Sequence, residues 1–160
     1  CNSYKIEIKQ NDNAQIISEK LSALAAEKIL DNLDNILDEK IEFKDQHHSE
    51  ATYANKIKKS EGQIRWYDTA ENIIGKINGL YPSPGAFFIY KGERYKILKA
   101  KLAYGIGKIG EVLDNYLEIG CGNKKSIKVL DIQRQGKKPQ NINEFMLGSQ
   151  IKKGSNLNNA

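Results

Sequence analysis

Two groups of cationic side chains are the residues of this sequence whose spacing points most clearly to chemistry. They are Lys56, Lys58 and Lys59 in the stretch ATYANKIKKSEGQIRW, and Arg134, Lys137 and Lys138 in the stretch QRQGKKP. Closely spaced Lys and Arg bind polyanions, because each cation that neutralises a phosphate releases counterions into solution. The two clusters therefore predict a surface that binds a phosphate-rich partner. Exposed lysines also serve simply as solvated charge, which is the competing interpretation of each cluster.

Residue types that support catalysis are present, but they do not stand at catalytic spacings. His47 and His48 are adjacent, so their side chains diverge, and no Cys or acidic residues stand around them at zinc-binding spacing. The glycines of residues 105–110 resemble a dinucleotide-binding loop, yet no helical pattern follows them, which favours a hairpin loop. Cys1 and Cys121 are too few for a disulfide framework. We expect no catalytic, cofactor-binding or metal-binding residues in this chain.

Charge divides the chain into two unlike parts. Residues 1–50 hold 6 Lys and Arg against 11 Asp and Glu, a net charge of −5, whereas residues 51–160 hold 19 against 9, a net charge of +10. Such asymmetry is typical of a protein with an interaction surface on one part. No apolar run approaches the ~20 residues that span a bilayer, and the N-terminus lacks the apolar core of a signal peptide. We expect a cytoplasmic location without membrane association.

The acidic part reads as one strand and one long helix. Residues 4–8 alternate apolar and polar side chains, which is the pattern of a half-buried strand. The run Asn11-Asp12-Asn13 offers side chains that cap the start of a helix, and apolar residues then recur every three or four positions through residue 37. The apolar stripe of this helix, residues 13–38, needs a partner larger than the strand. We expect that partner to be a sheet upstream of the present chain.

The basic part reads as short strands with tight turns. Asp68-Thr69 is expected to cap a short helix, and Trp66 just before it is expected to anchor the core. Strand patterns then follow at residues 86–90, 94–103, 111–113, 116–119 and 126–133, and a last short helix at residues 141–147. Short strands at this spacing, separated by Gly turns, favour a small barrel or sandwich. The expected fold class is therefore α+β.

Four motifs in residues 51–155 resemble the C-terminal part of methionyl-tRNA formyltransferases. They occur in the same order and with similar gaps, and they are ATYANKIKKSEGQIRW, NGLYPSPGAFF, QRQGKKP and EFMLGSQIKKGS. Residues 4–40 are similar to the last strand and helix of the catalytic domain of that family. The resemblance implies a remnant of the Rossmann-type formyl transferase domain at residues 1–40 and a basic linker at 41–63. It further implies an OB-like β-barrel at 64–155, and residues 156–160 are expected to be a frayed tail.

The resemblance also implies a role. The parent protein would be a one-carbon transferase of bacterial type that moves a formyl group from 10-formyltetrahydrofolate to initiator methionyl-tRNA in translation initiation. This chain would supply tRNA binding through the two basic clusters, while catalysis and the formyl donor would belong to a missing N-terminal domain. We expect the full-length protein to be a monomer. Two alternatives stay open: a formyltransferase that acts on an amino-sugar nucleotide, and a freestanding OB-type RNA-binding module.

Overall fold

The structure, a computed structural model, describes residues 3–158 and consists of two compact units, Cys1–Lys56 and Ile57–Ala160. The sequence suggested a linker that continues to residue 63. The division between the two compact units falls within this expected linker, after Lys56, and Gly62 packs closely in the C-terminal unit. A Cβ atom on Gly62 would collide with the carbonyl oxygen of Gly85 and would lie 3.4 Å from the ring of Phe87. Only glycine fits this approach.

The N-terminal unit is built on one helix, α1 (Ala14–Leu37), and a 3₁₀ turn, η1 (His48–Glu50). Asn13 caps α1 as expected, since its side chain accepts a hydrogen bond of 3.0 Å from the Ile16 amide. The strand expected at residues 4–8 is absent. A half-buried strand needs a neighbouring strand, and within residues 3–158 this segment pairs with none. No helix in that range is long and apolar enough to cross a membrane.

The apolar stripe of α1 is largely uncovered within this unit. Leu21, Ile29 and Leu33 are each more than 40% exposed, and no residue of α1 is buried. An apolar groove of about 280 Å³ runs along the helix beside Ile41 and Phe43. Uncovered apolar surface of this kind promotes association between molecules.

Deletion of residues 1–50 should therefore leave the C-terminal unit folded and make it more soluble. The reason is that the deleted segment contributes exposed apolar side chains and belongs to a separate compact unit. Far-UV circular dichroism and light scattering of the truncated and complete chains measure the two effects. Loss of β-sheet signal in the truncated chain would contradict this independence.

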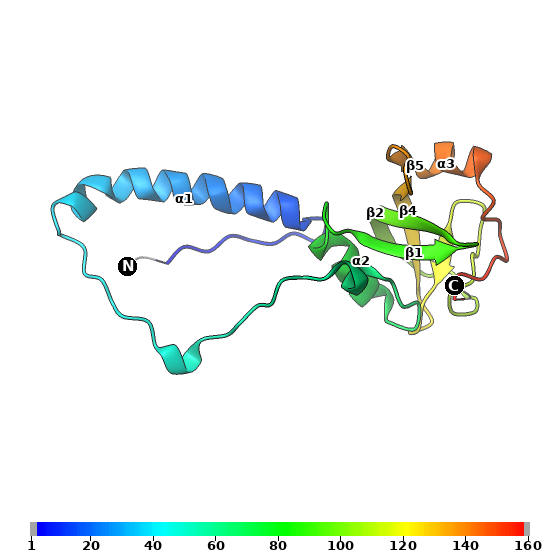
Figure 1. The fold of residues 1–160 in the computed structure, drawn as a ribbon, viewed down its shortest axis with the longest axis horizontal. Helices are drawn as coiled ribbons and strands as arrows, with labels where there is room; N and C mark the ends of the chain where they lie inside the picture. Colours follow the sequence, from blue (N-terminus) through cyan, green and yellow to red (C-terminus); the bar gives the residue numbers. More distant parts are fainter. Residues whose placement is uncertain (1–2, 159–160) are drawn as a thin grey trace. The chain divides into compact units, whose positions relative to one another are not determined.

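The C-terminal unit contains one five-stranded antiparallel sheet, flanked by two helices (Figure 1). The strands are β1 (Ala86–Tyr90), β2 (Glu93–Ala103), β3 (Glu118–Gly120), β4 (Ser126–Arg134) and β5 (Gln140–Asn141). The helices are α2 (Ala70–Gly79) and α3 (Ile142–Gly148), and the turn η2 (Lys59–Gly62) precedes them. The strand order is β1-β2-β4-β3, and β5 pairs with the end of β4. The expected strand at 111–113 is reduced to isolated bridges to Ile119 and Asn156.

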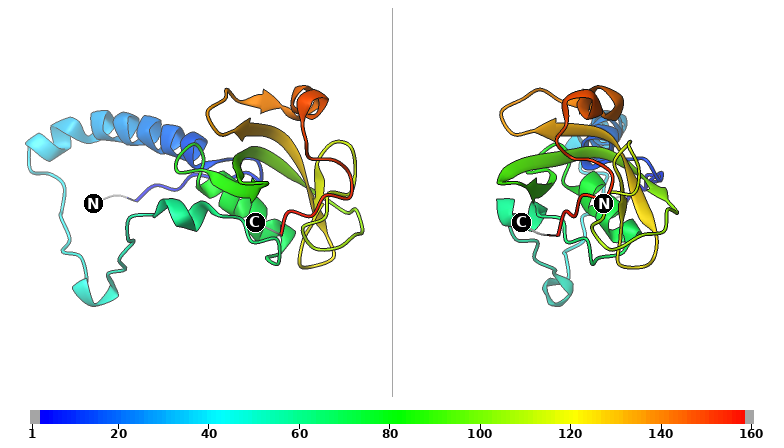
Figure 2. Two further views of the ribbon diagram at one scale, coloured as in Figure 1. Left: turned by 45° about the vertical axis from the view of Figure 1, so that its right-hand side comes forward. Right: turned by 90° about the vertical axis from the view of Figure 1, so that its right-hand side faces the viewer.

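The sheet is curved but open, so the α+β class is confirmed and the closed OB-like barrel is not (Figure 2). A barrel requires its first and last strands to pair, and β1 does not pair with β3. The outer edge of β1 instead meets the segment before α2, where the Ile64 amide donates a 2.7 Å hydrogen bond to the Phe87 carbonyl. This contact covers an edge that would otherwise expose unpaired backbone groups.

The core lies between the sheet, α2 and α3. Trp66 is only 2% exposed and meets Phe88 edge to face, with ring centroids 5.8 Å apart. Phe88 stacks on Tyr95 at 5.4 Å, and Tyr95 meets Phe145 of α3 edge to face at 5.8 Å. This chain of four rings joins the entry segment, strands β1 and β2, and α3. Trp66 is thus the core anchor that its position before the cap suggested.

The C-terminal segment is not frayed where the structure describes it. Leu157 is 3% exposed, and its amide donates a 2.8 Å hydrogen bond to the Gly110 carbonyl. Figure 2 shows this segment, in red, returning from α3 past the strands. Residues 159 and 160 of the expected tail lie outside the described residues.

Candidate nucleic-acid interface

The first basic cluster lies where the two units meet in sequence. Lys56 is the last residue of the N-terminal unit, and Lys58 and Lys59 begin the C-terminal unit at η2; all three are exposed. The turn at η2 is held by its own residues, because the Lys58 amide donates a 2.5 Å hydrogen bond to the Glu61 carboxylate. This bond uses the backbone of Lys58 and leaves its ammonium group available to an anion.

The second basic cluster lies at the end of β4 and in the turn that leads to β5. Arg134 is the last residue of β4, and Lys137 and Lys138 follow in the turn. Gly136 adopts a φ of +72°, which a residue without a Cβ adopts readily. The turn is further held by Gln133, whose side-chain amide donates a 2.8 Å hydrogen bond to the Lys137 carbonyl. The three cations are therefore placed by backbone geometry.

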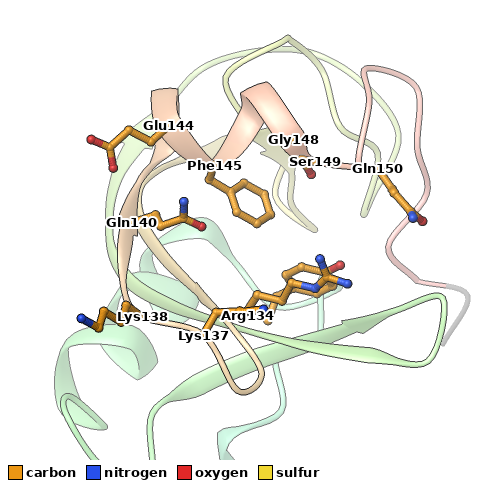
Figure 3. Close-up of a pocket in the computed structure, with 10 residues that line it drawn as sticks. Arg134, Lys137, Lys138, Gln140, Glu144, Phe145, Gly148, Ser149 and Gln150 are labelled. Carbon is orange, nitrogen blue, oxygen red and sulfur yellow. The ribbon is translucent and has the colours of Figure 1, made fainter.

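These three cations line a pocket of about 330 Å³ beneath α3 (Figure 3). The other lining residues are Tyr95, Gln140, Glu144, Phe145, Gly148, Ser149 and Gln150. Figure 3 shows Phe145 and Gln140 pointing into the pocket, whereas the Lys138 and Glu144 side chains point away from it. The pocket combines an aromatic wall, an amide and positive charge, which are the groups that contact nucleotides.

Arg134 is not a free cation, because the carboxylate of Glu93 pairs with its guanidinium. The other oxygen of Glu93 accepts a 2.7 Å hydrogen bond from the Tyr95 hydroxyl. The bond from Arg134, followed by that from Tyr95, lowers the pKa of Glu93 below its ordinary value. Burial, followed by the adjacent Glu93 carboxylate, raises the pKa of Tyr95 to about 12. Arg134 is thus already compensated, whereas within residues 3–158 no carboxylate forms an ion pair with Lys137 or Lys138 beside this pocket.

The Glu93–Arg134 pair should make stability depend on pH in the acid range. A carboxylate whose pKa is lowered by folding stabilises the folded state above its unfolded pKa, which is ~4.3, and this contribution is lost as the pH falls through the folded pKa. The difference in free energy of unfolding between the parent and Glu93→Gln should therefore be constant above about pH 5.5 and shrink below it. Urea titrations across this range measure the difference. A difference that grows as the pH falls would contradict the assignment.

Charged and nucleophilic groups outside the two basic clusters have structural roles in the fold. Lys125, next to Lys124 in a turn, pairs with Glu71, and the Asn123 amide donates a 2.8 Å hydrogen bond to the same carboxylate. Cys121 is buried, and this burial raises the pKa of its thiol to about 11, which disfavours the nucleophilic thiolate. Within residues 3–158, no group of three or more His, Cys, Asp and Glu side chains could hold a metal ion.

Sequence reasoning did not single out Glu93 as part of this site. Glu93 lies 41 residues before its partner Arg134, so no local spacing reveals the pair. A partial signal is the alternation of β2, which places Glu93 and Tyr95 on one face of a strand.

Most of the C-terminal unit, with both basic clusters, matches a known protein family. The family model described as formyl transferase, C-terminal domain, matches residues 56–150. The chain belongs to this family. Its matched range begins at Lys56 and includes the other five cations of the two basic clusters.

Curated relatives named methionyl-tRNA formyltransferase match almost the whole chain. The protein of this name from Pelagibacter ubique (strain HTCC1062) is 67% identical over 158 residues, which is 99% of this chain and 51% of the relative. The one from Rickettsia prowazekii (strain Madrid E) is 41% identical over 146 residues, 88% of this chain and 46% of the relative. The chain thus spans about half the length of the relatives it matches, and the match includes their C-terminal region.

Solved structures of HypX from Aquifex aeolicus share the fold. One variant superposes with a TM-score of 0.69 at 18% identity, covering 92% of this chain and 28% of that chain. A second, solved in complex with tetrahydrofolic acid, superposes with a TM-score of 0.60 at 21% identity, covering 81% and 24%. At this identity the likeness concerns the fold alone.

Proposed function

We propose that this chain is the C-terminal part of a methionyl-tRNA formyltransferase and that it holds the tRNA while a separate catalytic domain transfers the formyl group. The observation that carries the proposal is the 67% identity to a protein of that name, which extends over 99% of the chain. The parent enzyme would use 10-formyltetrahydrofolate as donor and initiator methionyl-tRNA as acceptor, in the cytoplasm. The relatives' names favour a tRNA substrate over an amino-sugar nucleotide.

The two basic clusters support the tRNA-binding role. Lys56, Lys58 and Lys59 are exposed on the segment that joins the two units, and Lys137 and Lys138 stand beside a pocket with an aromatic wall. RNA is recognised largely through its shape and backbone, and such contacts need exposed cations more than base-specific groups. Tetrahydrofolate and catalysis are not assigned to residues of this chain.

The purified chain should bind initiator tRNA in a strongly salt-dependent way and should transfer no formyl group. Fluorescence anisotropy with labelled initiator tRNA, over about 50 to 200 mM KCl, measures the first property. Incubation with 10-formyltetrahydrofolate and methionyl-tRNA, followed by detection of formyl-methionine, measures the second. Product well above an enzyme-free blank would overturn the division of labour, and binding that is insensitive to salt would overturn the binding role.

A further inference from the structure

The sheet carries a third group of cations, Arg94 and Lys96 of β2, that neither basic cluster includes. Phe87 of β1 is paired with Lys96 of β2, and Arg94 lies two residues before Lys96. Because partners in an antiparallel ladder and alternate residues of one strand share a face, these three side chains lie on the same face. Phe88 and Tyr95 lie on the opposite face and belong to the core. The third group therefore stands on the outer face of β1 and β2.

Arg94 is held flat on an aromatic ring. Its guanidinium carbon lies 3.6 Å from the centroid of the Phe87 ring, and its Nε is buried without a hydrogen-bond partner. Stacking on a ring fixes the planar guanidinium, so less side-chain freedom is lost when it binds an anion. Within residues 3–158, no carboxylate forms an ion pair with Arg94 or with Lys96. Both charges are therefore uncompensated.

A shallow pocket of about 260 Å³ surrounds these cations. Its lining residues are Arg94, Lys96, Gln133, Arg134, Gln135 and Gly136, and they include no acidic side chain. The side-chain amides of the two glutamines add hydrogen-bond donors, of which one N–H of Gln133 is already bonded to the Lys137 carbonyl. This set of groups fits a phosphate.

The pocket adjoins both basic clusters. On one side, a Cβ atom on Gly85 would lie 3.0 Å from Cδ of Lys96, and Gly85 itself packs on Gly62, the last residue of η2. On the other side, Gln135 and Gly136 of the turn after β4 line the pocket, and Arg134 lines both this pocket and the pocket beneath α3. Because Arg134 pairs with Tyr95 in the ladder, its side chain lies on the opposite face of the sheet from Arg94 and Lys96. The pocket therefore lies between η2 and the turn after β4, which carry lysines of the two basic clusters.

We propose that Arg94 and Lys96 form a phosphate-binding site that joins the two basic clusters into one path for the backbone of an RNA strand. This inference rests on the proposed function, because it names where on the chain the RNA backbone runs. The ligand chemistry is a phosphate group. A strand with successive phosphates engages all three cation groups at once, whereas a free phosphate ion engages one pocket.

The test uses the complete 160-residue chain, labelled initiator tRNA and the salt dependence of binding. Each phosphate contact contributes about 0.7–0.9 to the slope of log affinity against log salt, so Arg94→Gln with Lys96→Gln should flatten this slope by about 1.4–1.8. The pair Arg94→Lys with Lys96→Arg keeps both charges and should retain the parent slope. Thermal melts of all variants establish that they are folded.

The matched control is Lys152→Gln with Lys153→Gln, which removes the same charge from exposed residues that line neither pocket. Its slope should stay within error of the parent slope. An equal loss of slope in the control would mean that net charge alone acts, and it would overturn the site. An unchanged slope in the Arg94 and Lys96 double variant, with a parent that binds RNA, would overturn this inference and leave the proposed function standing. If the unmodified chain shows no salt-dependent binding of tRNA, both this inference and the proposed function are overturned.

A second arm separates an RNA strand from free phosphate. Inorganic phosphate replaces chloride at constant ionic strength while NMR follows the signals of Arg94 and Lys96, and the same signals are followed with tRNA. The expected result is that tRNA shifts both signals at low concentration and that inorganic phosphate shifts them only weakly. Saturation by inorganic phosphate, with no response to tRNA, would overturn the assignment to an RNA strand.

Discussion

Replacement of Trp66 by Ala should lower the free energy of unfolding of the C-terminal unit by about 3–5 kcal/mol. Trp66 is 2% exposed and begins the row of rings that continues through Phe88 and Tyr95 to Phe145. Its removal leaves a cavity between the entry segment and β1, and buried rings are the largest contributors to a core of this size. Since domains have only about 5–15 kcal/mol of stability in total, the loss should shift the urea midpoint strongly. Urea titration followed by far-UV circular dichroism measures it.

The matched control is Tyr67→Ala, one residue along the chain. The Tyr67 side chain is 72% exposed, so its removal should change stability by no more than about 0.5 kcal/mol. Trp66→Phe should fall between the two, because the indole Nε1 has no hydrogen-bond partner to lose and only part of the ring volume is removed. A Trp66→Ala variant as stable as Tyr67→Ala would show that the core does not depend on this ring.

Local patterns in the sequence were sufficient to predict most helices and strands of the C-terminal unit. The strand patterns of residues 86–90, a short apolar run, and of residues 94–103 predicted β1 and β2 to within one residue. Thr69 caps α2, because its side chain accepts a 3.2 Å hydrogen bond from the Asn72 amide. These elements are specified by neighbours in the chain, namely side chains that alternate on a strand or cap a helix. Their existence therefore follows from the sequence alone.

The features that could not be predicted depend on distant partners. Whether a curved sheet closes is decided by pairing between β1 and β3, which lie about thirty residues apart, and periodicity carries no information on that pairing. The prediction of a strand at residues 4–8 was wrong for a related reason: a strand needs a neighbouring strand, and within residues 3–158 this segment has none. In the candidate site, the cations of QRQGKKP were recognisable as a cluster. The pairing of Arg134 with Glu93, which reduces its availability to an anion, appears only in three dimensions.

Replacement of Lys56, Lys58 and Lys59 by Ala should flatten the salt dependence of tRNA binding by roughly two units of slope. All three side chains are exposed, and within residues 3–158 none forms an ion pair with a carboxylate, so each is free to release counterions from a phosphate. Over a fourfold rise in salt, the parent should lose roughly fifteenfold more affinity than the variant. Stability should change by no more than about 0.5 kcal/mol for each exposed substitution. Fluorescence anisotropy with labelled initiator tRNA measures the slopes, and thermal melts measure the stability.

The control removes two cations from a different turn, by Lys124→Ala with Lys125→Ala. Lys125 already pairs with Glu71, and this carboxylate also accepts a hydrogen bond from Asn123, so its charge is compensated within the fold. The control should therefore change the slope less per lysine than the triple variant does. Equal slopes for the triple variant and the parent would mean that the lysines at the junction of the two units only solvate it. The cations at the end of β4 would then be the principal contacts, because Lys137 and Lys138 are the remaining exposed cations among those the sequence singled out for tRNA binding.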